Sequence, residues 1–122
     1  MPMIVVVDDD QQIRTWLRQI LEGKGYDVRE AKDGYEALAY LERDDPALVV
    51  LDIFMPKVDG LEIIEHLHSR ARSVKILAIS GNPIPGYDAC GVAKAFGAHA
   101  TLRKPFTAEA FMKNVNALLP TQ

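Results

Sequence analysis

Cysteine is scarce in this chain, because Cys90 is the only one among 122 residues. A single cysteine cannot form a disulfide within the chain, so nothing in the sequence indicates an oxidising compartment. A chain of this length buries roughly two-thirds of its unfolded surface when it folds, and a hydrophobic content of 48% can supply the core. We therefore predict one domain over residues 1–122 that needs neither disulfides nor a structural metal.

Long apolar runs and long runs of one charge are also missing. The apolar segment at residues 4–7 is too short for a signal-peptide core or a membrane span, and three aspartates end it. The formal net charge is −3, and no run of Lys or Arg is long enough to follow a phosphate backbone. We predict a cytoplasmic protein that binds neither membranes nor nucleic acid directly.

What the sequence contains is a fivefold alternation of strand-length apolar runs and stretches with helical spacing of apolar residues. Such an alternation predicts a parallel sheet covered by helices on both faces. We expect strands at residues 4–7, 27–31, 48–51, 74–79 and 100–103. We expect helices at residues 11–22, from the cap at 33 to 43, from 59–60 onward, at 87–96, and from the cap at 107 to 118.

The polarity of the strands predicts their order. The first, third and fourth strands are almost entirely apolar, as central strands are, whereas the second and fifth carry charges suited to edges. This favours the order 2-1-3-4-5 of a flavodoxin-like α/β fold, a (βα)5 sandwich. In that fold, ligands bind at the carboxyl ends of the strands, where the first and third strands diverge.

Charged residues follow the strands at these carboxyl ends. Asp8 and Asp9 follow the first strand, Asp52 the third, and Lys104 the fifth. Clustered carboxylates repel one another unless a cation lies among them, which predicts a hard divalent metal. Lys104 then needs an anion, and a phosphoryl group on Asp52 would supply one. The neighbouring Asp10 is equally well explained as a helix N-cap.

Four motifs surround these groups, namely Val7-Asp8-Asp9, Leu51-Asp52-Ile53-Phe54-Met55-Pro56 running to Asp59-Gly60, Ser80-Gly81 and Lys104-Pro105-Phe106. With these motifs the sequence resembles the receiver domains of two-component response regulators over essentially the whole chain. The resemblance implies that Asp52 is the phosphoacceptor, taking a phosphoryl group from a sensor histidine kinase or a histidine phosphotransfer protein.

The same resemblance implies a Mg²⁺ site. Asp9 and Asp52 would hold the ion directly, Asp8 would act through a bound water, and the backbone carbonyl of Phe54 would supply a further ligand. Mg²⁺ suits such a site because it prefers oxygen ligands, keeps several waters, and usually takes one or two carboxylates plus a phosphate. The side chain of Phe54 is expected to hinder hydrolysis of the acyl phosphate, which predicts a long-lived phosphorylated form.

Ser80 and Lys104 complete the expected switch. In phosphoryl transfer the catalyst mainly positions the groups and stabilises charge, which the metal and Lys104 can do. The Ser80 hydroxyl would hydrogen-bond a phosphoryl oxygen and draw its loop toward Asp52, and a downstream protein or a separate output domain would read that change. By the same resemblance, we predict a cis peptide bond between Lys104 and Pro105.

One departure from the family pattern concerns the readout of the switch. Thr101 stands where many receivers have Tyr or Phe, and it is too small to fill the space of an aromatic ring. Either another group, such as His99 or Tyr87, moves instead, or the switch is read differently.

Three other functions remain open from the residues. A degenerate receiver could act as an unphosphorylated scaffold, although the acidic residues, hydroxyl and lysine are all present. A haloacid dehalogenase-type phosphohydrolase wants a second Asp two residues after the nucleophile, where Phe54 stands. A flavodoxin-like cofactor binder needs a phosphate cradle, and the acidic loop at residues 8–10 would repel FMN.

Overall fold

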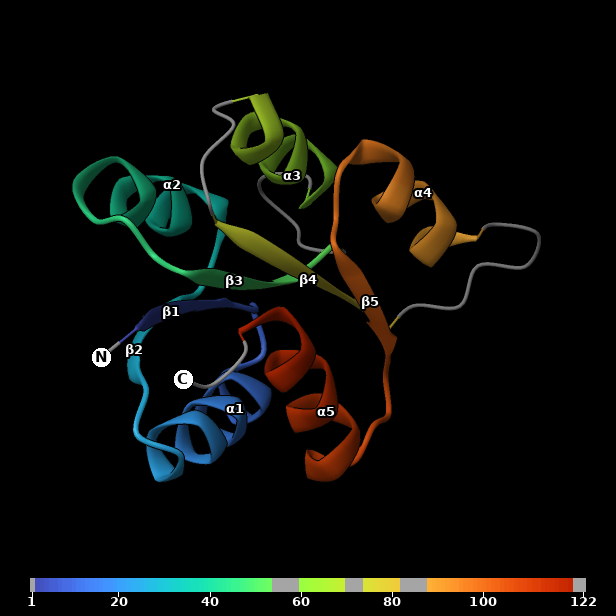
Figure 1. Cartoon of the computed structure of the whole chain (residues 1–122). Coiled ribbons are helices and arrows are strands. Elements are labelled where there is room, and N and C mark those ends of the chain that lie inside the picture. The colour runs from blue at the N-terminus through green and yellow to red at the C-terminus, as the bar shows by residue number, and fades with distance from the viewer. Residues whose placement is uncertain (1, 54–59, 70–73, 82–87, 120–122) are drawn as a thin grey trace.

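The computed structural model describes residues 2–53, 60–69, 74–81 and 88–119 (Figure 1). Strands and helices alternate along these residues, as the sequence predicts. The strands are β1 Met3–Val7, β2 Asp27–Ala31, β3 Leu48–Asp52, β4 Lys75–Ser80 and β5 Ala100–Arg103. The helices are α1 Gln11–Gly23, α2 Gly34–Arg43, α3 Gly60–Ser69, α4 Ala89–Phe96 and α5 Ala108–Leu118.

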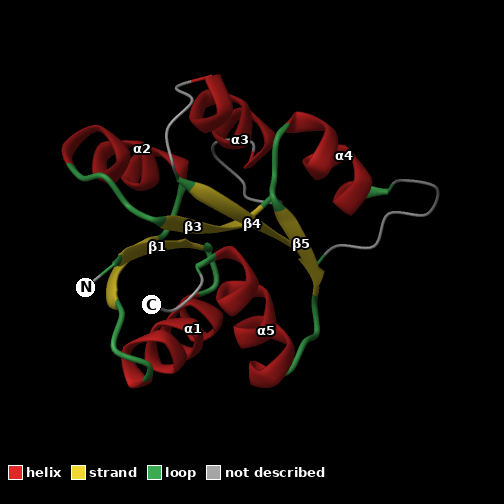
Figure 2. Ribbon diagram, viewed as in Figure 1, coloured by secondary structure: helices red, strands yellow, loops and turns green. Residues whose placement is uncertain are grey.

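The strands form one parallel sheet in the order β2-β1-β3-β4-β5. This confirms the predicted order and the flavodoxin-like fold. Figure 2 shows α1 and α5 on one face of the sheet and α2, α3 and α4 on the other. Since all strands run in the same direction, their carboxyl ends meet at one edge of the sheet, where a site can gather residues from distant parts of the chain.

Two hydrophobic clusters lie on opposite faces of the sheet, because successive strand side chains point to opposite sides. Full burial of each large aliphatic side chain contributes about 1.5 to 3 kcal/mol, so the two clusters anchor the central strands firmly. The cluster beneath α2, α3 and α4 includes Val5, Val7, Val49, Leu51, Ile76, Ile63, Ile64 and Ala93. The cluster beneath α1 and α5 includes Ile4, Val6, Leu48, Val50, Leu77, Leu17, Leu21, Phe111 and Val115.

Side-chain caps begin α1, α2 and α5 where the sequence predicts them. The Asp10 carboxylate accepts a hydrogen bond of 2.9 Å from the Gln12 backbone, so Asp10 is the N-cap of α1. Asp33 caps α2 in the same way, and Thr107 caps α5. These caps satisfy backbone N–H groups that have no partner within their own helix.

The predicted helix at 87–96 begins later in the structure, at Ala89, because Asp88 is its N-cap and accepts from the Gly91 backbone at 3.0 Å. Gly97 follows the helix with a φ of 123°, a conformation that favours glycine. Tyr87 and the rest of the segment at 82–87 lie outside the described residues.

Trp16 of α1 is a large aromatic residue that is only partly covered. Its side chain is 38% exposed, and its ring packs at the rim of the core with the Phe106 ring, 5.7 Å away between centroids. The neighbouring Leu17 and Leu21 are fully buried, so Trp16 lies at the margin of the buried face of α1. Among the described helices, none is long and apolar enough to cross a lipid bilayer.

Candidate functional site

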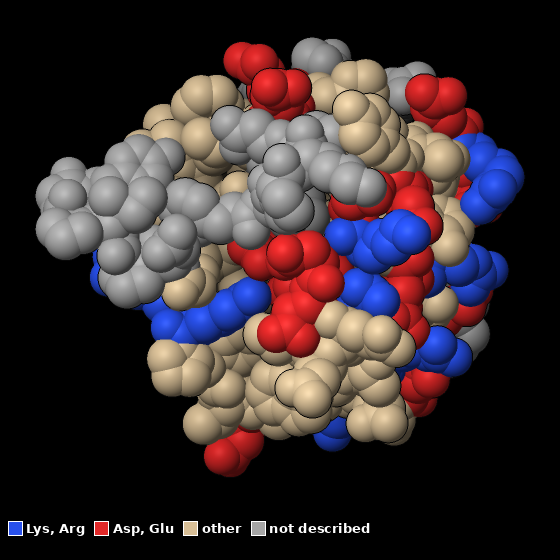
Figure 3. Space-filling model, turned by 180° about the vertical axis from the view of Figure 1, so that it is seen from behind, with Lys and Arg blue, Asp and Glu red and all other residues tan. Residues whose placement is uncertain are grey.

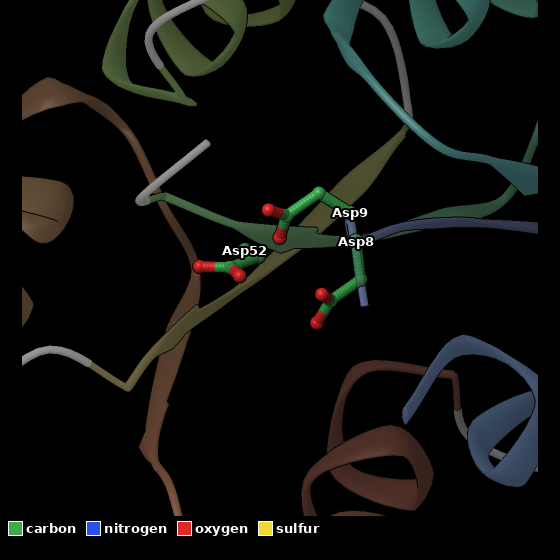
Figure 4. A group of neighbouring side chains, drawn as sticks. All are labelled: Asp8, Asp9 and Asp52. Carbon is green, nitrogen blue, oxygen red and sulfur yellow. The ribbon is translucent and has the colours of Figure 1, made fainter. Parts of the chain in front are cut away.

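Three carboxylates gather beyond the carboxyl ends of β1 and β3. Asp8 and Asp9 directly follow β1, and Asp52 is the last residue of the neighbouring β3. One oxygen from each carboxylate lies within 4.8 Å of the others (Figure 4). Asp8 and Asp52 are buried, with 1% and 4% of their surface exposed, whereas Asp9 is exposed. Two of the three carboxylates are therefore enclosed by the fold, and the group is open to solvent at Asp9.

Lys104 reaches this group from the end of β5. Its Nζ lies 3.0 Å from an Asp8 carboxylate oxygen and 3.2 Å from an Asp52 carboxylate oxygen. The side chain passes close to Gly81, where a Cβ would lie 2.5 Å from Lys104 Cδ. The absence of a side chain at Gly81 thus leaves room for the lysine to extend over the end of β4.

The charges of the site determine what it can bind. Burial disfavours the Lys104 ammonium, but the charge of Asp52 and the hydrogen bond and charge of Asp8 outweigh burial and raise the pKa of Lys104 above its ordinary value. The lysine therefore carries its charge at neutral pH and compensates one of three carboxylates. Three carboxylate oxygens so close together are the donor type that Mg²⁺ prefers, so these residues fit that ion.

Hydrogen bonds hold Asp8 in place. Its backbone N–H donates to the Ala31 carbonyl at 3.1 Å, and its second carboxylate oxygen accepts from the Asp10 N–H at 2.9 Å. Its backbone carbonyl accepts from Arg14 at 2.7 Å. No motif in the sequence points to Arg14, because an arginine in the first turns of a helix resembles a solvated surface residue.

Ser80 lies at the same edge of the sheet, as the last residue of β4 rather than in the loop after it. The reason is that the β4–β5 ladder extends to the pair Ser80–Arg103, and the Ser80 carbonyl accepts from the Lys104 N–H at 2.9 Å. Asp52 pairs with Ile79, so Ser80 stands one residue beyond the partner of Asp52. The Lys104–Pro105 peptide bond is cis, as predicted.

The structure bears on His99 but not on Phe54. Phe54, which is expected to bind Mg²⁺ through its carbonyl and to shield the acyl phosphate with its side chain, lies outside the described residues. His99 is at the amino end of β5, where its Nδ1 accepts from the Ile76 N–H at 3.0 Å. That end lies opposite the carboxyl edge that holds Asp52, so His99 does not replace the missing aromatic beside Ser80. Thr101 is half-buried in β5.

Comparison with known proteins identifies the class to which this fold and this acidic edge belong. Residues 4–116 match the response regulator receiver domain family. The chain therefore belongs to that family, and it is a receiver domain of the two-component response regulators. Proteins of this family normally bind Mg²⁺ at an acidic pocket.

Individual relatives agree with this assignment. The response regulator MprA of Mycobacterium leprae is 39% identical over 121 residues, which are 95% of this chain and 50% of that protein. MprA of Mycolicibacterium vanbaalenii is 40% identical, over 95% of this chain and 49% of its own length. The chain thus spans about half the length of these curated relatives.

Solved structures show the same fold. The Vibrio cholerae chemotaxis protein CheY4 superposes with a TM-score of 0.86 at 30% identity, covering 98% of this chain and 99% of that one. A CheY-like receiver domain protein from Methanospirillum hungatei gives a TM-score of 0.88 at 28% identity, over 96% of this chain and 92% of its own.

Proposed function

We propose that Asp52 is the phosphoacceptor of this receiver domain. The observation that carries the proposal is the position of its carboxylate, which is buried at the sheet edge beside two other aspartates and lies 3.2 Å from the Lys104 ammonium. A phosphorylated histidine on a sensor kinase or a phosphotransfer protein is the expected donor. The proposal would make this domain a phosphoacceptor that assists its own reaction rather than an enzyme.

The expected reaction is the transfer of a phosphoryl group from a histidine donor to the Asp52 carboxylate. A carboxylate oxygen of Asp52 attacks the phosphorus of the phosphohistidine, and the bond from phosphorus to imidazole nitrogen breaks with its electron pair on the nitrogen. The product is an acyl phosphate on Asp52. The Lys104 ammonium, now paired with carboxylates, would bind the negative phosphoryl oxygens as they arrive.

Asp8 and Asp9 have a different role in this proposal. Asp9 and Asp52 would hold Mg²⁺ directly, Asp8 would orient one of its waters, and the Phe54 carbonyl would add a further oxygen. When bound, the ion neutralises charge on the carboxylates and on the phosphoryl oxygens. The burial of Asp8 and its hydrogen bonds support a role in orientation, since such a side chain is already fixed.

Ser80 and the output are the second half of the proposal. After phosphorylation, the Ser80 hydroxyl would donate to a phosphoryl oxygen and shift the chain that follows β4, creating the state that a downstream protein or an output domain recognises. A net charge of −3 supports output through protein contact rather than direct binding of nucleic acid by these residues. A cytoplasmic location fits both the kinase partner and the single cysteine.

Labelling with a small phosphodonor tests the proposal. The protein is incubated with Mg²⁺ and acetyl phosphate, and intact-mass and peptide analyses locate the added group. We expect one phosphoryl group on Asp52 in the wild type and none at that position in Asp52→Asn. Asp45→Asn is a matched control, because Asp45 is exposed in the loop between α2 and β3 and its loss should leave labelling unchanged. A wild-type protein that stays unlabelled would favour the scaffold function instead.

A further inference from the structure

We propose that Arg14 is a positioning residue for the acidic site. It would hold the peptide unit between Asp8 and Asp9 and thereby fix the directions in which these two carboxylates face a metal. This inference rests on the proposed Mg²⁺ site and adds a residue to it from the first turns of α1. Arg14 itself touches neither the metal position nor the phosphoacceptor in this scheme.

The central contact is a short hydrogen bond to the backbone. Arg14 Nη1 donates to the Asp8 carbonyl at 2.7 Å, and the Arg14 side chain is only 12% exposed. That carbonyl belongs to the peptide that joins Asp8 to Asp9, so the guanidinium sets the tilt of this peptide plane. Hydrogen bonds from a charged donor are shorter and roughly twice as strong as neutral ones.

This contact completes the set of restraints on Asp8. The Asp8 N–H is tied to Ala31, and its two carboxylate oxygens are tied to Asp10 and Lys104. Without Arg14, the carbonyl would lose its charged donor, and the peptide could rotate. A rotation would displace Asp9, which is exposed at the rim of the site.

Glu30 on β2 fixes Arg14 from the other side. One Glu30 oxygen accepts from Arg14 Nε at 2.9 Å, and the other accepts from Arg18 at 2.7 Å. Hydrogen bonds from Arg18 and Arg14, opposed by partial burial, lower the pKa of Glu30, so the carboxylate stays charged at neutral pH. The planar guanidinium donates in two directions at once, to Glu30 and to the Asp8 carbonyl, which a single ammonium cannot reproduce. Figure 3 shows acidic side chains gathered on one face of the molecule, with Lys and Arg beside them.

Arg18 offers a matched control. It shares Glu30 with Arg14 and also pairs with Glu22 one turn further along α1, but its contacts lie away from Asp8. If the ion pairs between α1 and β2 matter only for stability, loss of either arginine has the same kind of effect. If Arg14 positions the site, only its loss changes the affinity for the metal.

The test measures the dissociation constant of Mg²⁺ for the whole unphosphorylated chain by titration calorimetry. We expect Arg14→Ala to weaken binding about tenfold, as loss of an outer-shell partner typically does. We expect Arg18→Ala to keep the wild-type constant. Urea unfolding of each variant reports stability separately, so a general loss of folding is not mistaken for a loss of affinity. The dissociation constant of Arg14→Lys should lie between those of wild type and Arg14→Ala. If Arg14→Ala does not fold, Arg14→Lys replaces it in the comparison.

The outcomes separate this inference from the proposed function. Wild-type affinity in the folded Arg14 variants, or an equal loss in Arg18→Ala, overturns the positioning role while the Mg²⁺ site stands. A wild-type protein that binds no Mg²⁺ overturns both. Weaker binding confined to the Arg14 variants supports the role.

Discussion

Lys104 bridges Asp8 and Asp52, two carboxylates that come from different strands. Its raised pKa has a consequence for stability that can be worked out by sign. The ammonium is favoured in the folded state, so its contribution is fully present below the ordinary value of 10.5 and is lost as the pH rises through the higher folded value. Alkaline pH should therefore release this restraint on the site.

The replacement Lys104→Met tests this at the scale of one residue. We expect the variant to be about 2 kcal/mol less stable than wild type at pH 8, because two neighbouring carboxylates lose their partner. The difference should begin to shrink above pH 10.5 and be lost once the pH has passed the raised pKa of the folded wild-type ammonium. Urea unfolding in the presence of a chelator, across alkaline pH, measures it.

Lys94→Met is the control for this experiment, because Lys94 is exposed on α4. Its loss should change stability little at any pH. A difference between Lys104→Met and wild type that stays constant over the whole range would mean that the lysine acts through packing rather than through charge.

At the scale of the element, α4 shows how a cap and a glycine depend on each other. The helix has eight residues, and the Asp88 carboxylate caps it by accepting from the Gly91 N–H. A Cβ built on Gly91 would collide with the same carboxylate. Gly91 therefore lowers the intrinsic helix propensity but leaves room for the cap.

A double-mutant cycle measures this dependence. Replacing Gly by Ala within a helix normally increases the free energy of unfolding by as much as about 1 kcal/mol. Here Gly91→Ala would displace the Asp88 cap, which contributes about the same amount. We expect Gly91→Ala to be neutral or destabilising in the wild-type background and stabilising in Asp88→Ala. Denaturant unfolding of the four proteins gives the coupling. An equal gain in both backgrounds would contradict the steric argument.

At the scale of the whole molecule, the acidic edge links metal binding to the stability of the entire sheet. The site takes residues from the ends of β1 and β3 and the lysine after β5, so a ligand there joins parts of the chain that separate on unfolding. A ligand that binds only the folded state raises the free energy of unfolding by RT ln(1 + [L]/Kd), where [L] is the free ligand concentration.

We expect Mg²⁺ at a hundred times its dissociation constant to stabilise the wild type by about 2.7 kcal/mol. Asp9→Asn should lose most of that increment, yet without Mg²⁺ it should be more stable than wild type by about 0.5 kcal/mol, because one repelling carboxylate is gone. Thermal or urea unfolding with and without Mg²⁺, at constant ionic strength, measures both quantities. Equal Mg²⁺ increments in the two proteins would exclude Asp9 as a ligand.

Local sequence patterns determined most of the architecture. Alternating apolar periods gave the elements, and the charged residues of β2 and β5 identified the edges, because a central strand covered on both faces cannot carry charges such as those of Arg29 and Glu30. The positions of Asp8, Asp9, Asp52 and Lys104 at strand ends followed from the same pattern. Helix caps such as Asp10 could be recognised from residue type and position alone, since capping involves residues close in sequence.

Only the tertiary structure decided the contacts between residues far apart in the chain. That Arg14 reaches the Asp8 carbonyl while Glu30 holds it depends on the register of β2 against β1 and on the angle of α1 over the sheet. The contact between His99 and Ile76 and the exposure of Trp16 depend on packing in the same way. The sequence by itself determined which groups this receiver domain has, because periodicity and polarity act locally. The fold decided how firmly each is held, because such contacts depend on register and packing between distant segments.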